Sequence, residues 1–319
     1  MSRLHPPLSA VRRAVALALE EDLLPLGDIT AALLPESALG EAAFVSRSYG
    51  VVAGTACVLE TCHQVDAGLE LTLRLDDGDL VVPGEVIASL RGRFASIVTV
   101  ERTALNFLCH LSGVATLTSR FVEAATAHNP GCRILDTRKT TPGLRALEKA
   151  AVRAGGGTNH RGSLSEGVLV KDNHLGHASI TEAVERALEL WPGRMLEVEC
   201  DRIDQVAEAV EAGATLVLCD NMTPAQLRDC VDLVRAHPRG RAGSVLVEAS
   251  GGVTLETVGA LAGSGADFVS VGALTHSAAI LDIGLDLMDA PPATIVHEPP
   301  VSVPEPPRSP VSESPHGLG

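Results

Sequence analysis

Charged and glycine-rich residues follow six short apolar runs in the second half of the sequence. In chain order they are Arg138-Lys139, Lys171-Asp172-Asn173, Glu199, Asp220-Asn221, Ser250-Gly251-Gly252 and Gly272. For any one position, a polar residue that meets solvent at a strand end is the simpler interpretation. Because active sites of parallel α/β barrels lie at the carboxyl ends of strands, the recurrence predicts a binding site for a phosphorylated, multiply anionic substrate.

The cationic residues of this set are suited to carboxylates and phosphates. Arg138 and the neighbouring His160-Arg161 pair can bind such groups through several parallel hydrogen bonds, and Lys139 and Lys171 can act as point charges. The whole chain has only three lysines, and two of them stand at these strand ends. These five positions predict the half of the site that neutralises the negative charge of the substrate.

The acidic and glycine-rich ends predict complementary functions. Glu199 and Asp220 can hold Mg²⁺, accept hydrogen bonds from sugar hydroxyls or stabilise a developing cation. The turns at Ser250-Gly251-Gly252 and at Gly272 leave backbone N–H groups accessible, and turns after the last strands of a barrel commonly bind phosphate. The sequence therefore predicts separate regions for the anionic, the sugar and the phosphate groups of the substrates.

Composition argues against several classes of partner. The formal net charge is −15, which argues against nucleic acid because binding its backbone needs a basic surface. No apolar run approaches the roughly 18 residues of a membrane span, and the N-terminus has no apolar leader, so we expect a cytoplasmic protein without membrane association. The seven cysteines form no CxxC pair, which indicates free thiols rather than disulfides or a zinc site.

Alternating strand and helix patterns surround the charged positions. Strands are expected in ILDTRK, GVLVKDN, LEVECD, LVLCDN, VLVEAS and FVSVGA, and helices at 144–155, 180–191, 203–213, 224–237 and 255–265. Continuous apolar strands between amphipathic helices predict a parallel sheet with helices on its outer face. Six such units can form an open or incomplete (β/α) barrel. A doubly wound sheet ranks second, because no GxGxxG turn follows the first strand.

The chain divides by pattern into three parts. Residues 1–115 predict an α/β (α+β) sandwich domain, with helices at about 9–23 and 99–126, and Asp77-Gly78 between two strand-like segments signals a hairpin. Residues 116–289 predict the barrel catalytic domain, whose last helix is expected to pack back on the N-terminal domain. Residues 290–319 hold nine of the 19 prolines and predict a disordered tail.

Six sequence blocks resemble those of one known family. DTRKTTPGLRALEKAAVRAGGGTNHRGSLSEGVLVKDNH is similar to the signature block of the quinolinate phosphoribosyltransferases, the carboxylating nicotinate-nucleotide pyrophosphorylases. ERTALNFLCHLSGVAT, LEVECD, LCDNM, EASGGVT and VGALTHSAAILDIGLD resemble the family's other blocks, in the same order. The resemblance covers about residues 10–288. It implies the transfer of phosphoribose from 5-phosphoribosyl-1-pyrophosphate to quinolinate, with release of pyrophosphate and CO₂, in NAD synthesis.

The resemblance also implies roles for particular residues, Mg²⁺ as cofactor, and a homodimer with sites at its interface, which could assemble further. It assigns the two quinolinate carboxylates to Arg138, His160, Arg161 and Lys171, together with Arg102 from the second subunit. It assigns the phosphoribosyl donor, and catalysis, to Lys139, Glu199 and Asp220, with the two carboxylates also holding Mg²⁺, partly through the substrate. It assigns the 5′-phosphate to Ser250, Gly251 and Gly272.

The sequence departs from the family pattern at Gly162-Ser163 and at Ala150, where bulkier or aromatic residues are usual. Both positions are expected near the quinolinate side of the site. Two alternatives to the transferase stay open. A Schiff-base lyase would use Lys171, although that chemistry favours an apolar, desolvated lysine and Asp172 follows it directly. A non-catalytic regulator that binds pyridine carboxylates is the other.

Overall fold

The N-terminal part of the chain builds a four-stranded antiparallel sheet. The computed structural model describes residues 4–176, 178–241 and 243–288. The sheet has the order β12-β1-β5-β3, formed by β1 (Leu39–Ser46), β3 (Glu70–Leu73), β5 (Val86–Arg93) and β12 (Ile283–Met288). The other elements of this part are α1 (Leu8–Leu23), η1 (Ala31–Leu33), β2 (Gly50–Val51), α2 (Thr55–Val65) and β4 (Leu80–Val81).

The Asp77-Gly78 turn does not form the expected hairpin. Strand β3 before it pairs with β5, and β4 after it pairs with β2, so the flanking strands belong to different sheets. Asp77 Oδ1 instead accepts hydrogen bonds from the N–H and the hydroxyl of Thr55, at 3.0 and 2.7 Å. These bonds hold the start of α2, a helix that the sequence patterns did not predict. The hairpin prediction was wrong because a turn signal indicates only that the chain reverses. Which strands then pair depends on which of their side chains must be buried against the rest of the fold.

Helix α3 (Phe94–Thr126) joins the two halves of the described chain. Its first half contributes Ile97, Val100 and Leu108 to the core beneath the N-terminal sheet, and its second half contributes Val114 and Phe121 to the barrel core. The division expected between residues 115 and 116 therefore lies inside one continuous helix, and the chain as far as Met288 forms one compact unit.

Six parallel strands form the second sheet. They are β6 (Arg133–Leu135), β7 (Val168–Val170), β8 (Leu196–Cys200), β9 (Leu216–Asp220), β10 (Leu246–Ser250) and β11 (Phe268–Ser270). Their order is β6-β11-β10-β9-β8-β7, so the first strand lies beside the last, as in a barrel. Strands β6 and β7 end the sheet on either side and do not pair with each other within the described residues, which confirms the open (β/α) barrel.

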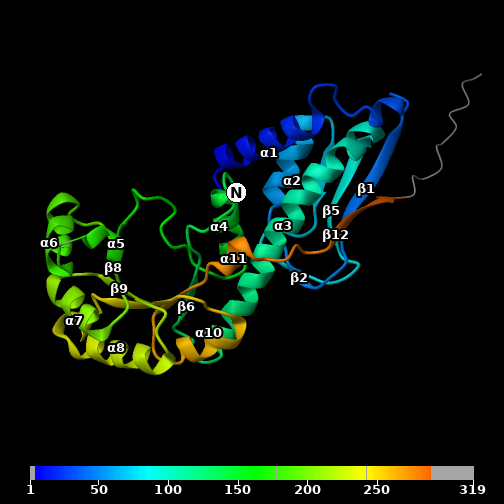
Figure 1. Ribbon diagram of the computed structural model, residues 1–319. Coiled ribbons are helices and arrows are strands. Elements are labelled where there is room, and N and C mark those ends of the chain that lie inside the picture. The colour runs from blue at the N-terminus through cyan, green and yellow to red at the C-terminus, as the bar shows by residue number, and fades with distance from the viewer. Residues whose placement is uncertain (1–3, 177, 242, 289–319) are drawn as a thin grey trace, which may run out of the picture. The chain divides into compact units, whose positions relative to one another are not determined.

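Helices follow the barrel strands (Figure 1), and the longer ones lie in nearly the expected places, whereas three helices of four residues each were not expected. They are α4 (Arg145–Ala154), α5 (Asp172–Leu175), α6 (Ile180–Leu190), α7 (Ile203–Ala212), α8 (Pro224–Ala236), α9 (Pro238–Arg241), α10 (Leu255–Ala262) and α11 (Ala273–His276). Ser179 and Thr223 cap α6 and α8 with reciprocal capping boxes. Alternate strand residues, such as Val198 and Cys200, face these helices in the apolar core, so the residues between them point into the barrel.

The C-terminal end of the described chain differs from its expectation. The segment expected to return as a helix is strand β12, which pairs antiparallel with β1 at the edge of the N-terminal sheet (Figure 1). Its alternation of apolar and polar residues, IGLDLM, is a strand period rather than a helical one. The proline-rich stretch 290–319 lies outside the described residues.

All seven cysteines are free and buried, as expected. Within the described ranges we find no helix whose length and apolar character would let it span a bilayer.

Candidate active site

A cavity of about 580 Å³ opens at the carboxyl ends of the barrel strands. Nearly all of the residues singled out from the sequence line it. The lining is Thr137, Arg138, Lys139, His160, Arg161, Leu169, Lys171, Glu199, Leu218, Asp220, Asn221, Glu248, Ser250, Gly251, Gly252 and Ser270. Because these residues come from all six strands, the loops after them and the segment before β7, the tertiary fold alone brings the separated sequence positions together.

The cationic side of the cavity is formed after β6 and before β7. Burial, reinforced by the positive charge of Arg138, lowers the pKa of Arg161. Arg161 Nη1 donates to the carbonyl of Gly167 at 2.9 Å, and Arg138 Nε is buried without a hydrogen-bond partner in the described part of the chain. Two guanidinium groups that repel each other in a partly buried cleft are suited to an anion that would bridge them.

Lys171 and Glu199 form an ion pair across the neighbouring strands β7 and β8. The sequence assigned them to different substrates, whereas in the structure Lys171 Nζ donates to Glu199 Oε2. The Schiff-base alternative favours an apolar surrounding for its lysine, and this carboxylate contact does not provide one. Both side chains still line the cavity.

The ends of β9 and β10 lie in register, with Ser250 opposite Asp220. Asn221 donates to Asp220 Oδ2 at 2.7 Å and adopts a left-handed backbone with φ 55°. Gly251 has φ +96°, and a Cβ there would lie 2.2 Å from the side-chain oxygen of Asn221. Glycine is therefore required for this close approach of the two strand ends, which places the bare backbone of Gly251 and Gly252 at the cavity wall.

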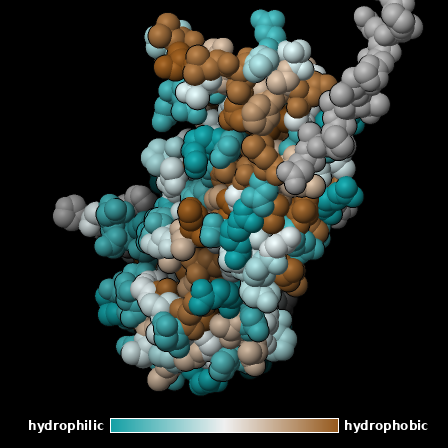
Figure 2. All heavy atoms as spheres, turned by 90° about the vertical axis from the view of Figure 1, so that its right-hand side faces the viewer, coloured by the Kyte–Doolittle hydropathy of each residue, from teal (hydrophilic) through white to brown (hydrophobic). Residues whose placement is uncertain are grey.

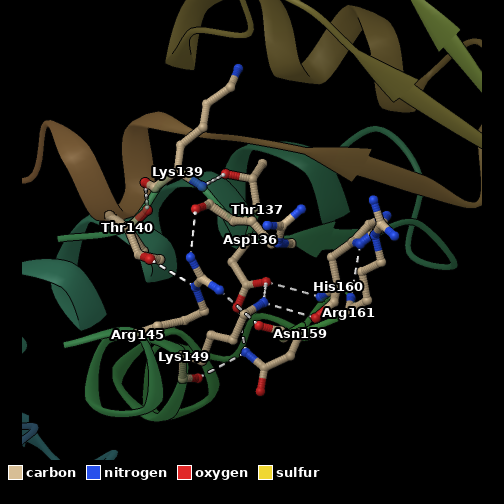
Figure 3. A network of polar contacts seen from close by, with 12 residues as sticks. Asp136, Thr137, Lys139, Thr140, Arg145, Lys149, Asn159, His160 and Arg161 are labelled. Atoms are coloured by element: carbon tan, nitrogen blue, oxygen red, sulfur yellow. Dashed lines mark hydrogen bonds and ion pairs between the residues drawn. The ribbon is translucent and has the colours of Figure 1, made fainter. Parts of the chain in front are cut away.

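Lys139 and Gly272 meet at the opposite edge of the site. Gly272 is not among the lining residues, but a Cβ on it would lie 3.2 Å from Lys139 Cδ. Thr275 Oγ1 donates to the Lys139 carbonyl at 2.8 Å, which connects α11 to the loop after β6. The Lys139 side chain is exposed and extends away from the polar network around it (Figure 3).

Arg102 lies apart from the other predicted residues. It is exposed on α3 and lines a second hollow of about 350 Å³. That hollow shares no lining residue with the main cavity. Ala150 and Gly162-Ser163, expected near the quinolinate side, do not line the main cavity either. Ala150 is instead buried in α4.

A buried polar network that the sequence analysis missed supports the loop carrying His160 and Arg161 (Figure 3). Asp136, which is fully buried, accepts from Lys149 Nζ, from Asn159 Nδ2 and from the backbone N–H of His160. Lys149 also donates to the His160 carbonyl at 2.8 Å. The available signals were in the signature block, because Asn159 directly precedes His160 and Lys149 is the one lysine of the three that does not stand at a strand end.

Two glutamates beneath the cavity were also missed. Glu197 and Glu248 are fully buried, and each lies two residues before a predicted site residue, Glu199 or Ser250, on the same face of its strand. His160 Nε2 lies 3.0 Å from Glu197 Oε2 and 3.6 Å from Glu248 Oε2. The alternation of the strand was the signal that could have found them.

The fold and the cavity together define an open-barrel enzyme site with cationic, acidic and glycine-rich regions. Family models for the N-terminal and C-terminal domains of quinolinate phosphoribosyl transferase match residues 28–112 and 114–286. The chain therefore belongs to the quinolinate phosphoribosyltransferase family, a family of pentosyltransferase enzymes.

Relatives and solved structures agree with this family. The chain is 41% identical over 264 residues to the probable carboxylating nicotinate-nucleotide pyrophosphorylase of Bacillus subtilis, covering 82% of this chain and 88% of the relative. It is 40% identical over 283 residues to the Mycobacterium leprae enzyme of the same name, covering 87% and 97%. The structure of nicotinate-nucleotide pyrophosphorylase from Francisella tularensis superposes with a TM-score of 0.83 at 35% identity, covering 89% of this chain and 98% of that one.

Proposed function

We propose that this protein joins the ring nitrogen of quinolinate to the ribosyl carbon of 5-phosphoribosyl-1-pyrophosphate, with release of pyrophosphate and CO₂. The product is nicotinate mononucleotide, a precursor of NAD. The observation that carries the proposal is the single cavity in which paired guanidiniums, two carboxylates and a glycine-rich turn converge. Both substrates carry several negative charges, so an acidic protein must concentrate its cations where they bind.

Quinolinate binds on the side of Arg138 and Arg161 in this proposal. The two guanidiniums lie close enough for the charge of one to lower the pKa of the other, and a planar dicarboxylate would relieve that repulsion. Lys171 contributes a third cation once it exchanges Glu199 for substrate. His160 lies beside Arg161 at the same wall. Together these residues orient the ring nitrogen toward the ribose, a positioning task.

The ribosyl donor occupies the side of Glu199 and Asp220. Their carboxylates stabilise the positive charge that develops on the ribose as pyrophosphate leaves, and they accept hydrogen bonds from the ribose hydroxyls. Ser250, Gly251 and Gly272 bind the 5′-phosphate through backbone N–H groups, and Lys139 binds near the pyrophosphate. After nitrogen attack the ring is cationic and accepts the electrons of the departing 2-carboxylate.

Mg²⁺ is the cofactor in this proposal. Two carboxylates, Glu199 and Asp220, line the same cavity, and hard oxygen ligands of this kind suit Mg²⁺, which usually binds through one or two carboxylates and substrate phosphates. When bound, the ion supplies positive charge that neutralises the pyrophosphate. Glu199 and Asp220 would hold it, partly through the substrate.

A homodimer completes the site in this proposal, and it could assemble further. Arg102 is exposed on α3 and outside the main cavity of its own chain, so a second subunit is needed to bring such a residue to quinolinate. Large apolar side chains are exposed in the N-terminal part, among them Leu26 at 81% and Leu33 at 82%. Apolar atoms also gather in patches on the face shown in Figure 2.

The seven free cysteines support a reducing compartment, the cytoplasm.

The assay supplies quinolinate, the ribosyl donor and Mg²⁺ and monitors nicotinate mononucleotide and CO₂. We expect stoichiometric formation of both. Turnover with nicotinate but not with quinolinate would refute the substrate assignment. Borohydride trapping of a covalent adduct at Lys171 would support the Schiff-base lyase instead.

A further inference from the structure

A histidine and two glutamates form a cluster in the barrel interior beneath the cavity. His160 Nε2 lies within 3.0 Å of Glu197 and 3.6 Å of Glu248. Both glutamates have no solvent exposure, and their four carboxylate oxygens have no hydrogen bond of standard geometry within the described residues. Parallel α/β barrels usually fill this interior with branched apolar side chains. The two glutamates are therefore costly for the fold, and their presence needs a reason beyond packing.

The cluster places titratable groups where the fold alone would avoid them. Burial, with the neighbouring Glu197, raises the pKa of Glu248 to about 8. Burial by itself would lower the pKa of His160, but the contact with Glu197 and the charge of Glu248 outweigh it and leave that pKa raised. Taking an ionised group out of water is unfavourable unless it is well paired. The His160 imidazole lies against both carboxyl groups, and the Ser270 hydroxyl is a further partner of Glu248.

The protein engages both ring nitrogens of His160. Nε2 faces the two glutamates, while Nδ1 accepts a hydrogen bond from the backbone N–H of Arg161 at 2.8 Å. The backbone of His160 is held as well, because its N–H donates to Asp136 and its carbonyl accepts from Lys149 (Figure 3). The imidazole therefore connects the barrel interior to the start of Arg161, whose guanidinium lies at the cavity wall.

We propose that Glu197 and Glu248 are positioning residues that act through His160 to hold Arg161 against one carboxylate of the substrate. The two carboxylates keep Nε2 turned into the barrel, so Nδ1 remains an acceptor for the Arg161 N–H. This inference rests on the proposed function, because it concerns the binding of quinolinate. It deepens that function by naming buried residues on which quinolinate binding depends. The ribosyl donor, bound beside Asp220 and Ser250, does not depend on it.

The test measures steady-state kinetics and Tm for Glu248→Gln and Glu197→Gln. We expect KM for quinolinate to rise about ten-fold, as for a weakened hydrogen bond to a charged group, with KM for the ribosyl donor unchanged. Tm should equal or exceed that of the wild type, because each substitution replaces a buried carboxyl group that lacks a full set of partners with a group that carries no charge. Glu60→Gln is the matched control, since Glu60 is another buried glutamate, on α2, and should leave both KM values unchanged.

A double-mutant cycle separates positioning from general stability. In a His160→Asn background, Glu248→Gln should raise KM for quinolinate no further, because the glutamate acts through the imidazole. Additive effects, unchanged quinolinate KM in both single variants, or a lower Tm with equal loss toward both substrates would each overturn the inference. A divalent metal that co-purifies at one ion per chain and is lost in Glu248→Gln would also overturn it, since the cluster would then be a metal site.

The wild-type reaction distinguishes this inference from the proposed function. If the wild type forms no nicotinate mononucleotide from quinolinate, the proposed function fails, and the inference fails with it. If the wild type turns over and the variants keep its quinolinate KM, only the inference fails. If one glutamine variant is insoluble, the other still tests the inference, because Glu197 and Glu248 come from different strands.

Discussion

Replacing Lys149 by methionine perturbs the buried network beneath the substrate loop. Lys149 is 6% exposed and bonds both Asp136 and the His160 carbonyl. Its removal leaves the Asp136 carboxylate, whose pKa burial already raises, without its cationic partner. Breaking a buried ion pair in this way costs about 3–5 kcal/mol. Since the unfolding entropy of a chain of 319 residues is on the order of 0.6 kcal/mol per degree, Tm should fall by about 5–8 °C.

The assay is thermal unfolding of the wild type, Lys149→Met, and the double variant Asp136→Asn with Lys149→Met. The double variant should recover most of the lost stability, because it leaves no unpaired charge. Catalytic activity should fall in both, since the His160 carbonyl loses its donor in each. A Tm for Lys149→Met within about 2 °C of the wild type, which corresponds to roughly 1 kcal/mol, would refute the reasoning that this pair stabilises the fold.

Three further predictions follow from the site. Gly251→Ala should lower Tm and raise KM for the ribosyl donor, because its Cβ would lie 2.2 Å from a side-chain oxygen of the neighbouring strand end; Gly84→Ala, also at positive φ but with open space around it, should change only Tm. Inactive Arg102→Ala and Arg138→Ala subunits should recover partial activity when mixed, and failure to complement in confirmed dimers would contradict a shared site. Because the pKa of Glu248 is raised to about 8 in the folded state, its contribution to stability should fall as pH rises from about 4.5 to 8; equal pH dependence of Tm in the wild type and in Glu248→Gln would contradict this.

Much of the barrel and its site could be predicted from local sequence. The strands and the longer helices between 133 and 276 follow from apolar runs that alternate with amphipathic periods, a signal that depends on neighbouring residues only. Arg138, Lys171 and Asp220 were found because charged residues ended those runs. Their meeting in one cavity then followed from the geometry of parallel strands.

The N-terminal sheet could be predicted only in part. Strand segments were recognisable, but β3 pairs with β5 rather than across the Asp77-Gly78 turn, and β12 arrives from the far end of the described chain. Pairing between distant segments depends on which surfaces must be buried together, and local sequence patterns do not contain this information.

By itself the sequence determined the open-barrel class, the family and the residue types at the strand ends, since each rests on local periods or contiguous motifs. Only the tertiary structure decided which of these residues contact one another. It paired Lys171 with Glu199 and kept Arg102 outside the cavity of its own chain. It also enclosed Glu197 and Glu248 around His160. The physical reason is that burial and electrostatic partnership depend on distances across the fold, and these are not properties of any segment alone.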